Sequence, residues 1–249
     1  MEQQFITAIK LSSLPPERDY VRDLPVVHNL AQMRELAFPS PVTFFVGENG
    51  IGKSTLIEAI ALCCGFNPEG GTRNFSFSTK NTHSDLWEHM TVVKSWRRPK
   101  DGFFLRAESF YNVSTNIDEM DEEEGLGAPV KNSYGGLSLH ERSHGESFLA
   151  AVENRFGGNG LYILDEPEAA LSPGGILQLM ANMNELVRKG SQFIVSTHSP
   201  MLIAFPGATV YELTEEGITA VPYKQTAHYT TVRRFLENPE SILRILFGE

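Results

Sequence analysis

The feature that most constrains the fold of this chain is a glycine-rich run between two apolar stretches. It consists of Gly47, Glu48, Asn49, Gly50, Ile51, Gly52, Lys53 and Ser54. The preceding residues VTFFV predict a buried strand, and the stretch from Lys53 to Cys64 predicts a helix. Between a strand and a helix, such glycines let backbone N–H groups turn inward around phosphate oxygens, beside the positive end of the helix. The run therefore predicts an α/β fold with a phosphate-binding loop.

Polar side chains extend this predicted site into the helix. Lys53 supplies a positive charge for the β- and γ-phosphates of a nucleotide, and the Ser54 hydroxyl can bind Mg²⁺. Thr55 follows directly in the chain and is assigned to the same site. The strand before the loop and the helix after it are the context that phosphate binding requires, so the motif is specific.

A second apolar run, Leu161–Leu164, ends in the neighbouring carboxylates Asp165 and Glu166. Because α/β folds bind ligands at the carboxyl ends of their strands, both acids are expected beside the phosphates. Asp165 is predicted to hold Mg²⁺, largely through water, and Glu166 to orient or deprotonate the attacking water. The alternative is a buried strand followed by an acidic helix cap, which the phosphate loop upstream makes the weaker interpretation.

A third apolar run, Phe193–Ser196, leads to His198, which is therefore expected at the same sheet edge. A histidine there can donate a hydrogen bond to the γ-phosphate. Ser199 and Pro200 also read as the cap and the first residue of a helix, and the two interpretations are compatible.

The rest of the chain alternates between short strand-like and helical runs, which predicts an α/β sheet with covering helices. Further strands are expected near Phe5, from Phe103, and in a hairpin whose turn spans 214–217. Helices are expected over 144–154, 175–189 and 232–247. We predict one domain over residues 1–249, in which about 73–156 contain an inserted lobe and a further helix.

The order of these motifs resembles that of the ATP-binding-cassette (ABC) ATPases. Between the phosphate loop and the acid pair lies the segment RSHGE, at the place of the family's Leu-Ser-Gly-Gly-Gln signature. Ser143 and Gly145 match the signature, whereas Arg142, His144 and Glu146 depart from it. The resemblance covers essentially the whole chain and implies a mixed central sheet with flanking helices, a small antiparallel β lobe and a helical signature lobe.

The resemblance also implies ligands and partners. Family members bind ATP and Mg²⁺, hydrolyse ATP, and form a head-to-tail dimer with two ATPs at its interface. In such a homodimer, Ser143 and Gly145 would contact the γ-phosphate held by the other subunit. A glutamine that senses Mg²⁺ in the family corresponds to Glu108 here, which we expect to reach the metal or its water. Tyr20 is the candidate for the aromatic residue that stacks on adenine, although a structural tyrosine fits equally well.

Transporter subunits typically carry the intact glutamine and signature, and this chain has neither. Its Thr-His-Ser-Pro after the third apolar run, the Gly-Glu end of its signature and its Glu-Ala-Ala-Leu after the acid pair resemble the heads of soluble chromosome-maintenance, recombination-repair and defence-associated ATPases, here compact and without a coiled coil. We therefore expect an ATP-gated switch that acts on a protein or nucleic-acid partner. Two alternatives stay open: the energy-coupling subunit of a membrane transporter, and an assembly module that binds ATP but barely hydrolyses it.

Composition limits the location and the partners of the chain. No apolar run of about 18 residues exists, so no direct membrane insertion is expected. The N-terminus does not read as a secretory signal, and the only cysteines are the neighbours Cys63 and Cys64, so a cytoplasmic location is predicted. The net charge of −10 argues against broad nucleic-acid binding, although the stretch 73–106 is locally basic.

Overall fold

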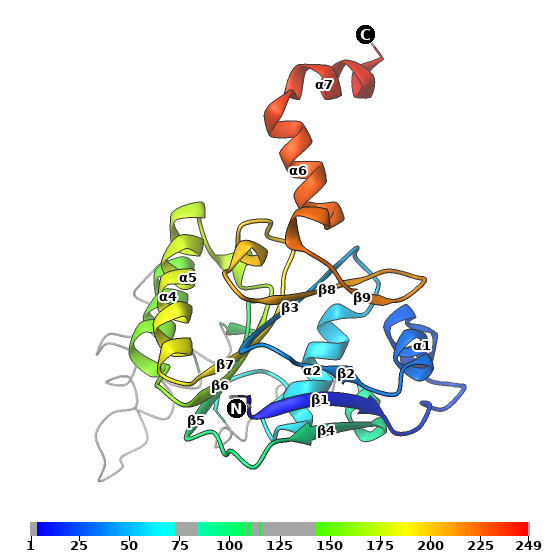
Figure 1. The fold of residues 1–249 in the computed structure, drawn as a ribbon, viewed down its shortest axis with the longest axis vertical. Coiled ribbons are helices and arrows are strands. Elements are labelled where there is room, and N and C mark those ends of the chain that lie inside the picture. The colour runs from blue at the N-terminus through cyan, green and yellow to red at the C-terminus, as the bar shows by residue number, and fades with distance from the viewer. Residues whose placement is uncertain (1–3, 73–83, 108, 111–114, 116–142, 249) are drawn as a thin grey trace.

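A central sheet orders the strands β5-β6-β7-β3-β8-β9 in the computed structural model, which describes residues 4–72, 84–107, 109–110, 115 and 143–248 (Figure 1). The strands span Asp101–Arg106 (β5), Gly160–Asp165 (β6), Gln192–Ser196 (β7), Val42–Gly47 (β3), Thr209–Leu213 (β8) and Ile218–Ala220 (β9). Neighbours from β5 to β8 run parallel, whereas β9 pairs antiparallel with β8. The sheet is therefore mixed, and the predicted hairpin is confirmed.

The three middle strands explain why their sequences are continuous apolar runs. Every residue of β3, β6 and β7 is buried. Parallel strands covered on both faces have no solvent side, so their side chains do not alternate between apolar and polar. The predicted strands near Phe44, Leu161 and Phe193 are confirmed for this reason.

A second, smaller sheet has the order β2-β1-β4 and is antiparallel. It consists of Leu36–Ala37 (β2), Ile6–Leu11 (β1) and Met90–Lys94 (β4). This sheet is the small antiparallel β lobe that the resemblance implied. β4 is not among the strands expected from the sequence, although its residues MTVVK include a threonine and two valines, which favour strands; only the first of the five residues is buried.

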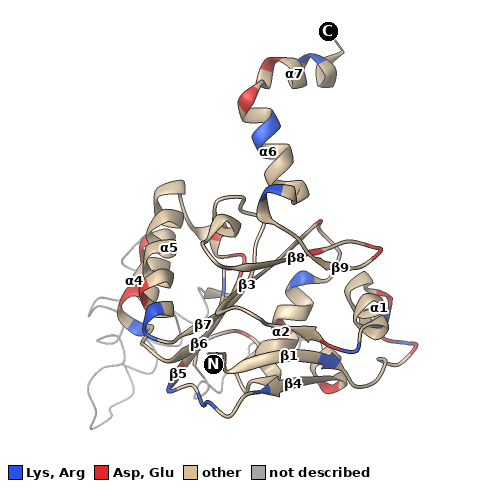
Figure 2. Cartoon of the chain, viewed as in Figure 1, with Lys and Arg blue, Asp and Glu red and all other residues tan. Residues whose placement is uncertain are grey.

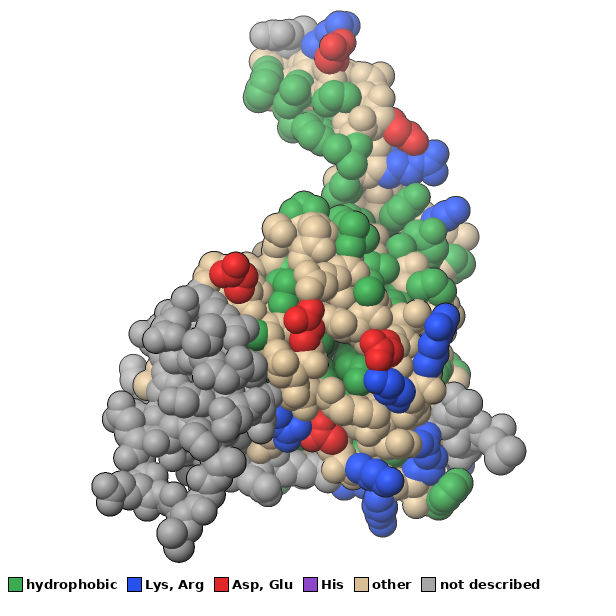
Figure 3. Space-filling model, turned by 90° about the vertical axis from the view of Figure 1, so that its left-hand side faces the viewer, with side chains coloured by type: hydrophobic (Ala, Val, Ile, Leu, Met, Phe, Trp, Pro, Cys, Tyr) green, Lys and Arg blue, Asp and Glu red, His purple; other side chains and the backbone are tan. Residues whose placement is uncertain are grey.

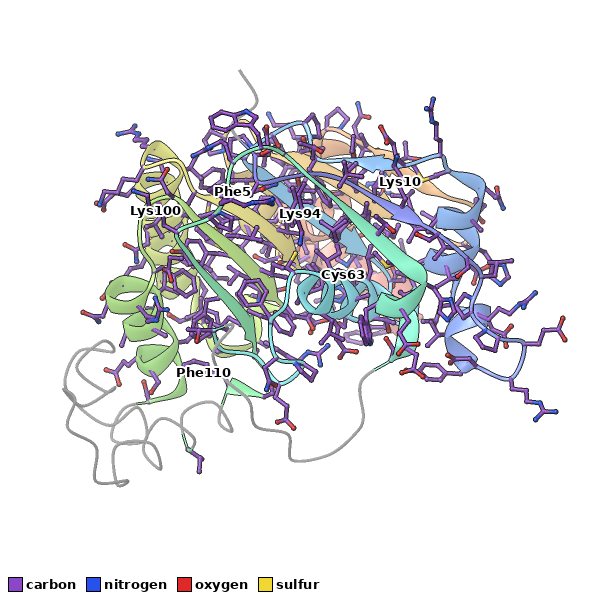
Figure 4. All side chains as sticks on the ribbon, turned by 90° about the horizontal axis from the view of Figure 1, so that it is seen from below. Phe5, Lys10, Cys63, Lys94, Lys100 and Phe110 are labelled. Carbon is purple, nitrogen blue, oxygen red and sulfur yellow. The ribbon has the colours of Figure 1, made fainter. Side chains whose placement is uncertain are left out.

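Helices pack on both faces of the central sheet and create two apolar cores. On one face, α2 (Lys53–Cys63) and α1 (Pro25–Gln32) share a core with the small sheet. Viewed from below, the small sheet lies across α2, and Cys63 marks the end of that helix (Figure 4). On the other face, α4 (His144–Arg155) and α5 (Pro173–Arg188) cover β6 and β7.

Short 3-10 turns connect these elements: η1 (Tyr20–Asp23), η2 (Asp85–His89), η5 (Pro167–Ala170), η6 (Leu202–Ala204) and η7 (Tyr223–Gln225). Together the sheets and helices confirm the predicted α/β class with a mixed central sheet. That residues 1–249 form one domain, and that about 73–156 contain an inserted lobe, stay predictions, since much of that lobe lies outside the described residues.

The C-terminal arm, defined as α6 (Ala227–Glu237) and α7 (Pro239–Phe247), projects away from the sheets (Figure 1). The sequence predicted helical structure over 232–247, but the structure interrupts it at Asn238. Pro239 has no N–H group and disfavours the helical conformation of the residue before it. The Asn238 side chain instead caps α7 by accepting a hydrogen bond from the Ser241 N–H, at 3.2 Å.

Candidate functional site

The carboxyl ends of β3, β6 and β7 bring the three predicted motifs together. Asp165, the last residue of β6, is paired with Ser196, the last residue of β7. The Glu166 N–H donates to the Ser196 carbonyl at 3.1 Å, and His198 Nε2 lies 3.5 Å from Glu166 Oε1. The phosphate loop follows β3, which pairs with β7. The expectation that loop, acid pair and histidine share one sheet edge is confirmed.

The phosphate loop has the backbone geometry that its glycines allow. Gly47 and Gly52 have φ angles of +154° and +97°. A Cβ atom on Gly52 would lie 2.5 Å from Val26 Cγ1, and one on Gly47 would lie 2.4 Å from the Leu213 carbonyl oxygen. Both positions therefore combine a left-handed backbone with close packing, which only glycine tolerates.

Lys53 begins α2 and is buried, with 5% of its surface exposed. Its ammonium donates to the carbonyl oxygens of Gly47 and Glu48, at 2.8 and 2.9 Å, so it reaches back over the loop. Burial lowers the pKa of Lys53, while the carboxylates of Glu166 and Asp165 oppose that shift. Among the described residues no side chain caps the N-terminus of α2, so its first N–H groups stay available at the loop.

One pocket of about 190 Å³ is lined by three of the predicted site residues, Ser54, Asp165 and Glu166. Its walls are formed by Ser54, Arg106, Ala107, Asp165, Glu166, Ala169 and Ala170. The described residues contain no group of three or more His, Cys, Asp or Glu side chains that would hold a metal ion unaided. A hydroxyl and a carboxylate facing one pocket nevertheless fit Mg²⁺, which commonly takes one or two protein oxygens and completes its shell with phosphates and water.

Asp165 is already engaged through both carboxylate oxygens. Its Oδ1 accepts a hydrogen bond from Ser196 Oγ at 2.5 Å, and its Oδ2 accepts one from Arg106 Nε at 3.0 Å. Each of these oxygens keeps a further lone pair that could accept from a metal-bound water, and the metal role of Asp165 stays a prediction.

Arg106 is a residue of this site that sequence reasoning missed. It ends β5 directly opposite Asp165 and bridges two buried acids, because its Nη1 also lies 2.8 Å from Glu58 Oε2. Burial lowers the pKa of Arg106, but Asp165 and Glu58 outweigh burial and raise it. The available signal was a single basic residue at the carboxyl end of an apolar strand.

Glu166 lies in a left-handed conformation, with φ 49° and ψ 52°. A non-glycine residue is rarely found there, and such backbone strain is concentrated at functional sites. Its neighbour His198 has a lowered pKa because of burial and the nearby Lys53 and His228. The lowered pKa favours a neutral imidazole near pH 7, which can donate from one ring nitrogen.

The signature segment begins α4 and does not line this pocket within the described chain. The Ser143 side chain accepts from the Glu146 N–H, and the Glu146 carboxylate accepts from the Ser143 N–H at 2.9 Å. This capping box gives Glu146 a structural role at the start of α4, one that a glutamine could also fill. A Cβ on Gly145 would lie 2.8 Å from the Ala170 carbonyl oxygen, so the glycine is needed for packing.

Three other predictions remain without support. Glu108 lies outside the described residues, so its proposed role near the metal stays a prediction. Tyr20 is 63% exposed on η1, and its stacking on adenine also stays a prediction. In the basic stretch, the Arg97 guanidinium lies 4.7 Å from the centre of the Phe5 ring, and Arg106 is paired internally, so fewer cations remain for nucleic acid. Trp96, in contrast, is 82% exposed.

Comparisons with known proteins identify the class of this fold. Residues 28–116 match the family described as "AAA domain", and residues 137–204 match one described as "AAA domain, putative AbiEii toxin, Type IV TA system". A putative metal-chelate type ABC transporter in an inward-facing conformation is 13% identical, with a TM-score of 0.51, covering 92% of this chain and 88% of that one. A nucleotide-free ATP-binding cassette from an ABC transporter is 17% identical, with a TM-score of 0.50, covering 87% and 90%. The fold is that of a P-loop ATPase.

Related sequences give a second line of evidence on the protein family. The cobalt import ATP-binding protein CbiO of Salmonella typhimurium is 27% identical over 188 residues, which cover 70% of this chain and 68% of that protein. The ribose import ATP-binding protein RbsA of Roseobacter denitrificans is 27% identical over 199 residues, which cover 71% of this chain but only 37% of that protein. The matches over residues 28–116 and 137–204 identify AAA/ABC-type P-loop ATPase sequence in this chain, in line with the resemblance seen in its motifs. None of its described helices combines the length and the apolar character needed to cross a bilayer.

Proposed function

We propose that this chain binds Mg-ATP at the carboxyl edge of its central sheet and hydrolyses it. The observation that carries the proposal is that Glu166, which lines the pocket, lies 3.5 Å from His198 at the same sheet edge as the phosphate loop with Lys53. A positive charge for the phosphates, a carboxylate for the water and a hydrogen-bond donor for the γ-phosphate are the groups that phosphoryl transfer to water requires.

Each residue has a defined part in this proposal. Lys53 exchanges the loop carbonyls for the β- and γ-phosphates, and the N–H groups of residues 47–55 surround the phosphate oxygens. Glu166 orients the attacking water and takes its proton. His198 donates to the γ-phosphate as a neutral imidazole. Mg²⁺ bound with the nucleotide would add positive charge to the phosphates, held by Ser54 and, through water, by Asp165.

The carboxylate substitution Glu166→Gln tests this assignment. Phosphate release should fall at least about 100-fold, because the general base is lost, while ATP affinity should stay within about threefold of the unmodified value. Lys53→Ala should instead lose ATP binding itself. A Glu166→Gln protein that releases phosphate at the unmodified rate would show that another group activates the water.

We further propose that ATP joins two copies of this chain. Ser143 and Gly145 lie outside the pocket of their own chain, and the family resemblance gives them a role at the γ-phosphate of the other subunit. The Glu166→Gln protein should therefore form dimers with ATP and return to monomers without it, which light scattering measures directly. A mass that does not respond to nucleotide would contradict the ATP-gated homodimer.

The work that this switch performs depends on its partner, which we propose to be a protein or a nucleic acid in the cytoplasm. The alternative is a transporter subunit, and it is favoured by the import functions named for the cobalt and ribose relatives. The ATP-trapped Glu166→Gln protein distinguishes the two. Co-purification of a membrane protein would support transport, whereas binding to a non-membrane protein or to nucleic acid would support the switch.

A further inference from the structure

The ring of His198 makes a second contact on the side away from Glu166. Its Nδ1 lies 2.9 Å from Nε2 of His228, and the two rings are 5.0 Å apart at an angle of 58°. His228 belongs to the first turn of α6, so a residue of the C-terminal arm touches the proposed γ-phosphate donor. The backbone of His198 is held separately, because its N–H donates to Glu168 Oε1.

Only one hydrogen atom can lie between the two ring nitrogens, and the nitrogen that carries it determines the tautomer of His198. If His228 Nε2 carries the hydrogen, the neutral His198 ring carries its own hydrogen on Nε2. If His198 Nδ1 carries it, Nε2 presents a lone pair instead. That lone pair would face the Glu166 carboxylate oxygen 3.5 Å away, an acceptor facing an acceptor. The first arrangement is therefore favoured.

The first turn of α6 is anchored where it carries His228. Thr226, which is fully buried, caps the helix by accepting from the Tyr229 N–H at 3.3 Å. The Ala227 N–H donates to Glu212 Oε1 at 2.8 Å, which ties the turn to β8. His228 Nδ1 is buried and has no hydrogen-bond partner among the described residues, so Nε2 is its one described polar contact.

We propose that His228 is a positioning residue for hydrolysis: its Nε2–H holds His198 in the tautomer whose Nε2–H faces the γ-phosphate. This inference rests on the proposed function. Because His228 stands at the base of the C-terminal arm, it also connects the orientation of that arm to the nucleotide site. A partner that moved the first turn of α6 would release the His198 ring without touching the phosphates.

Substitutions of His228 separate the hydrogen bond from packing. His228→Ala removes the donor and should lower kcat about 10- to 100-fold, by analogy with the loss of groups that orient metal-bound histidines. ATP affinity should change by no more than about twofold, because no phosphate contact is lost. His228→Gln keeps an N–H donor near the Nε2 position and should recover most of the rate. Thr231→Ala, an exposed change on the same helix, serves as the control and should leave kcat unchanged.

The tautomer itself can be measured without turnover. Nitrogen-15 NMR of histidine-labelled protein should show His198 protonated on Nε2 in the unmodified and His228→Gln proteins, and a tautomer mixture in His228→Ala. Failure of the unmodified protein to hydrolyse ATP would contradict the proposed function but leave this readout intact. His198 protonated on Nδ1 in the unmodified protein, or a His228→Gln protein as slow as His228→Ala, would overturn the positioning role even if His228→Ala fails to fold.

Discussion

The helix that follows the phosphate loop and the C-terminal arm both carry apolar side chains, but the helix buries them and the arm exposes them. In α2, the apolar residues Leu56, Ile57 and Ile60 are fully buried between the two sheets. In α6 and α7 no residue is buried, and Leu236, Ile245, Leu246 and Phe247 are 69–79% exposed. Figure 3 shows hydrophobic side chains gathered along the arm, and Figure 2 shows charges of both signs on it. Sequence amphipathicity alone does not distinguish a packed helix from an unpacked one.

The difference indicates which part of the molecule is rigid and which part is free to change its orientation. The groups around the phosphate loop are fixed by strands that are buried on both faces, so their positions are costly to change. The arm is attached mainly through its first turn, where His228 meets His198. The described chain therefore combines a rigid sheet edge, where the proposed site lies, with a C-terminal arm that few contacts restrain.

The largest expected effect comes from the core. Phe44 is fully buried at the centre of β3, so Phe44→Ala should lower the free energy of unfolding by about 3–5 kcal/mol. The matched arm variant Phe247→Ala should change it by less than about 0.5 kcal/mol. Chemical denaturation of the two variants tests the comparison. Similar losses would mean that the arm packs against the protein in solution.

The next effect concerns the buried acids at the edge. Arg106→Met leaves the carboxylates of Glu58 and Asp165 without their shared cation, so it should destabilise the protein by about 3 kcal/mol. Arg106→Lys should recover only part of this, because one ammonium cannot reproduce the two-sided guanidinium contact. Denaturation midpoints measure both variants. Full stability in Arg106→Met would contradict the bridging role.

A smaller, pH-dependent effect is expected at the start of β5. Burial would raise the pKa of Asp101, but hydrogen bonds from Tyr162 and Arg155 outweigh burial and lower it. Its contribution to stability is thus fully present above the unfolded pKa of about 3.9 and is lost as the pH falls through the folded pKa. Asp101→Asn should lower Tm at pH 7 and flatten the decline of Tm below pH 4. An unchanged acid decline would contradict this assignment.

The smallest effect is expected on the arm. Arg233 and Glu237 form an ion pair of 2.7 Å on α6, but their side chains are 57% and 59% exposed. Exposed pairs one helical turn apart contribute little, because solvent screens them and their side chains lose freedom. Arg233→Ala should leave Tm unchanged at physiological salt. A clear loss of Tm would indicate that the arm is structured by more than its own helix.

The sequence predicted those parts of the site that are local in the chain. The phosphate loop, Asp165, Glu166 and His198 each follow an apolar strand, and parallel strands place such residues at one edge. Arg106 and His228 could not be assigned, because their partners are 48 and 30 residues away and their roles arise from tertiary contacts. The Ser143–Glu146 capping box was visible as a spacing, but it was interpreted only as a departure from the family signature.

The most direct test of the account is a crystal structure of the Glu166→Gln protein with Mg-ATP. We predict the γ-phosphate within hydrogen-bonding distance of both Lys53 Nζ and His198 Nε2, with Lys53 released from the Gly47 and Glu48 carbonyls. Ser54 should contact the metal, and a second copy should present Ser143 across the nucleotide. Nucleotide bound away from Lys53, or a γ-phosphate out of reach of His198, would contradict the proposed catalytic edge.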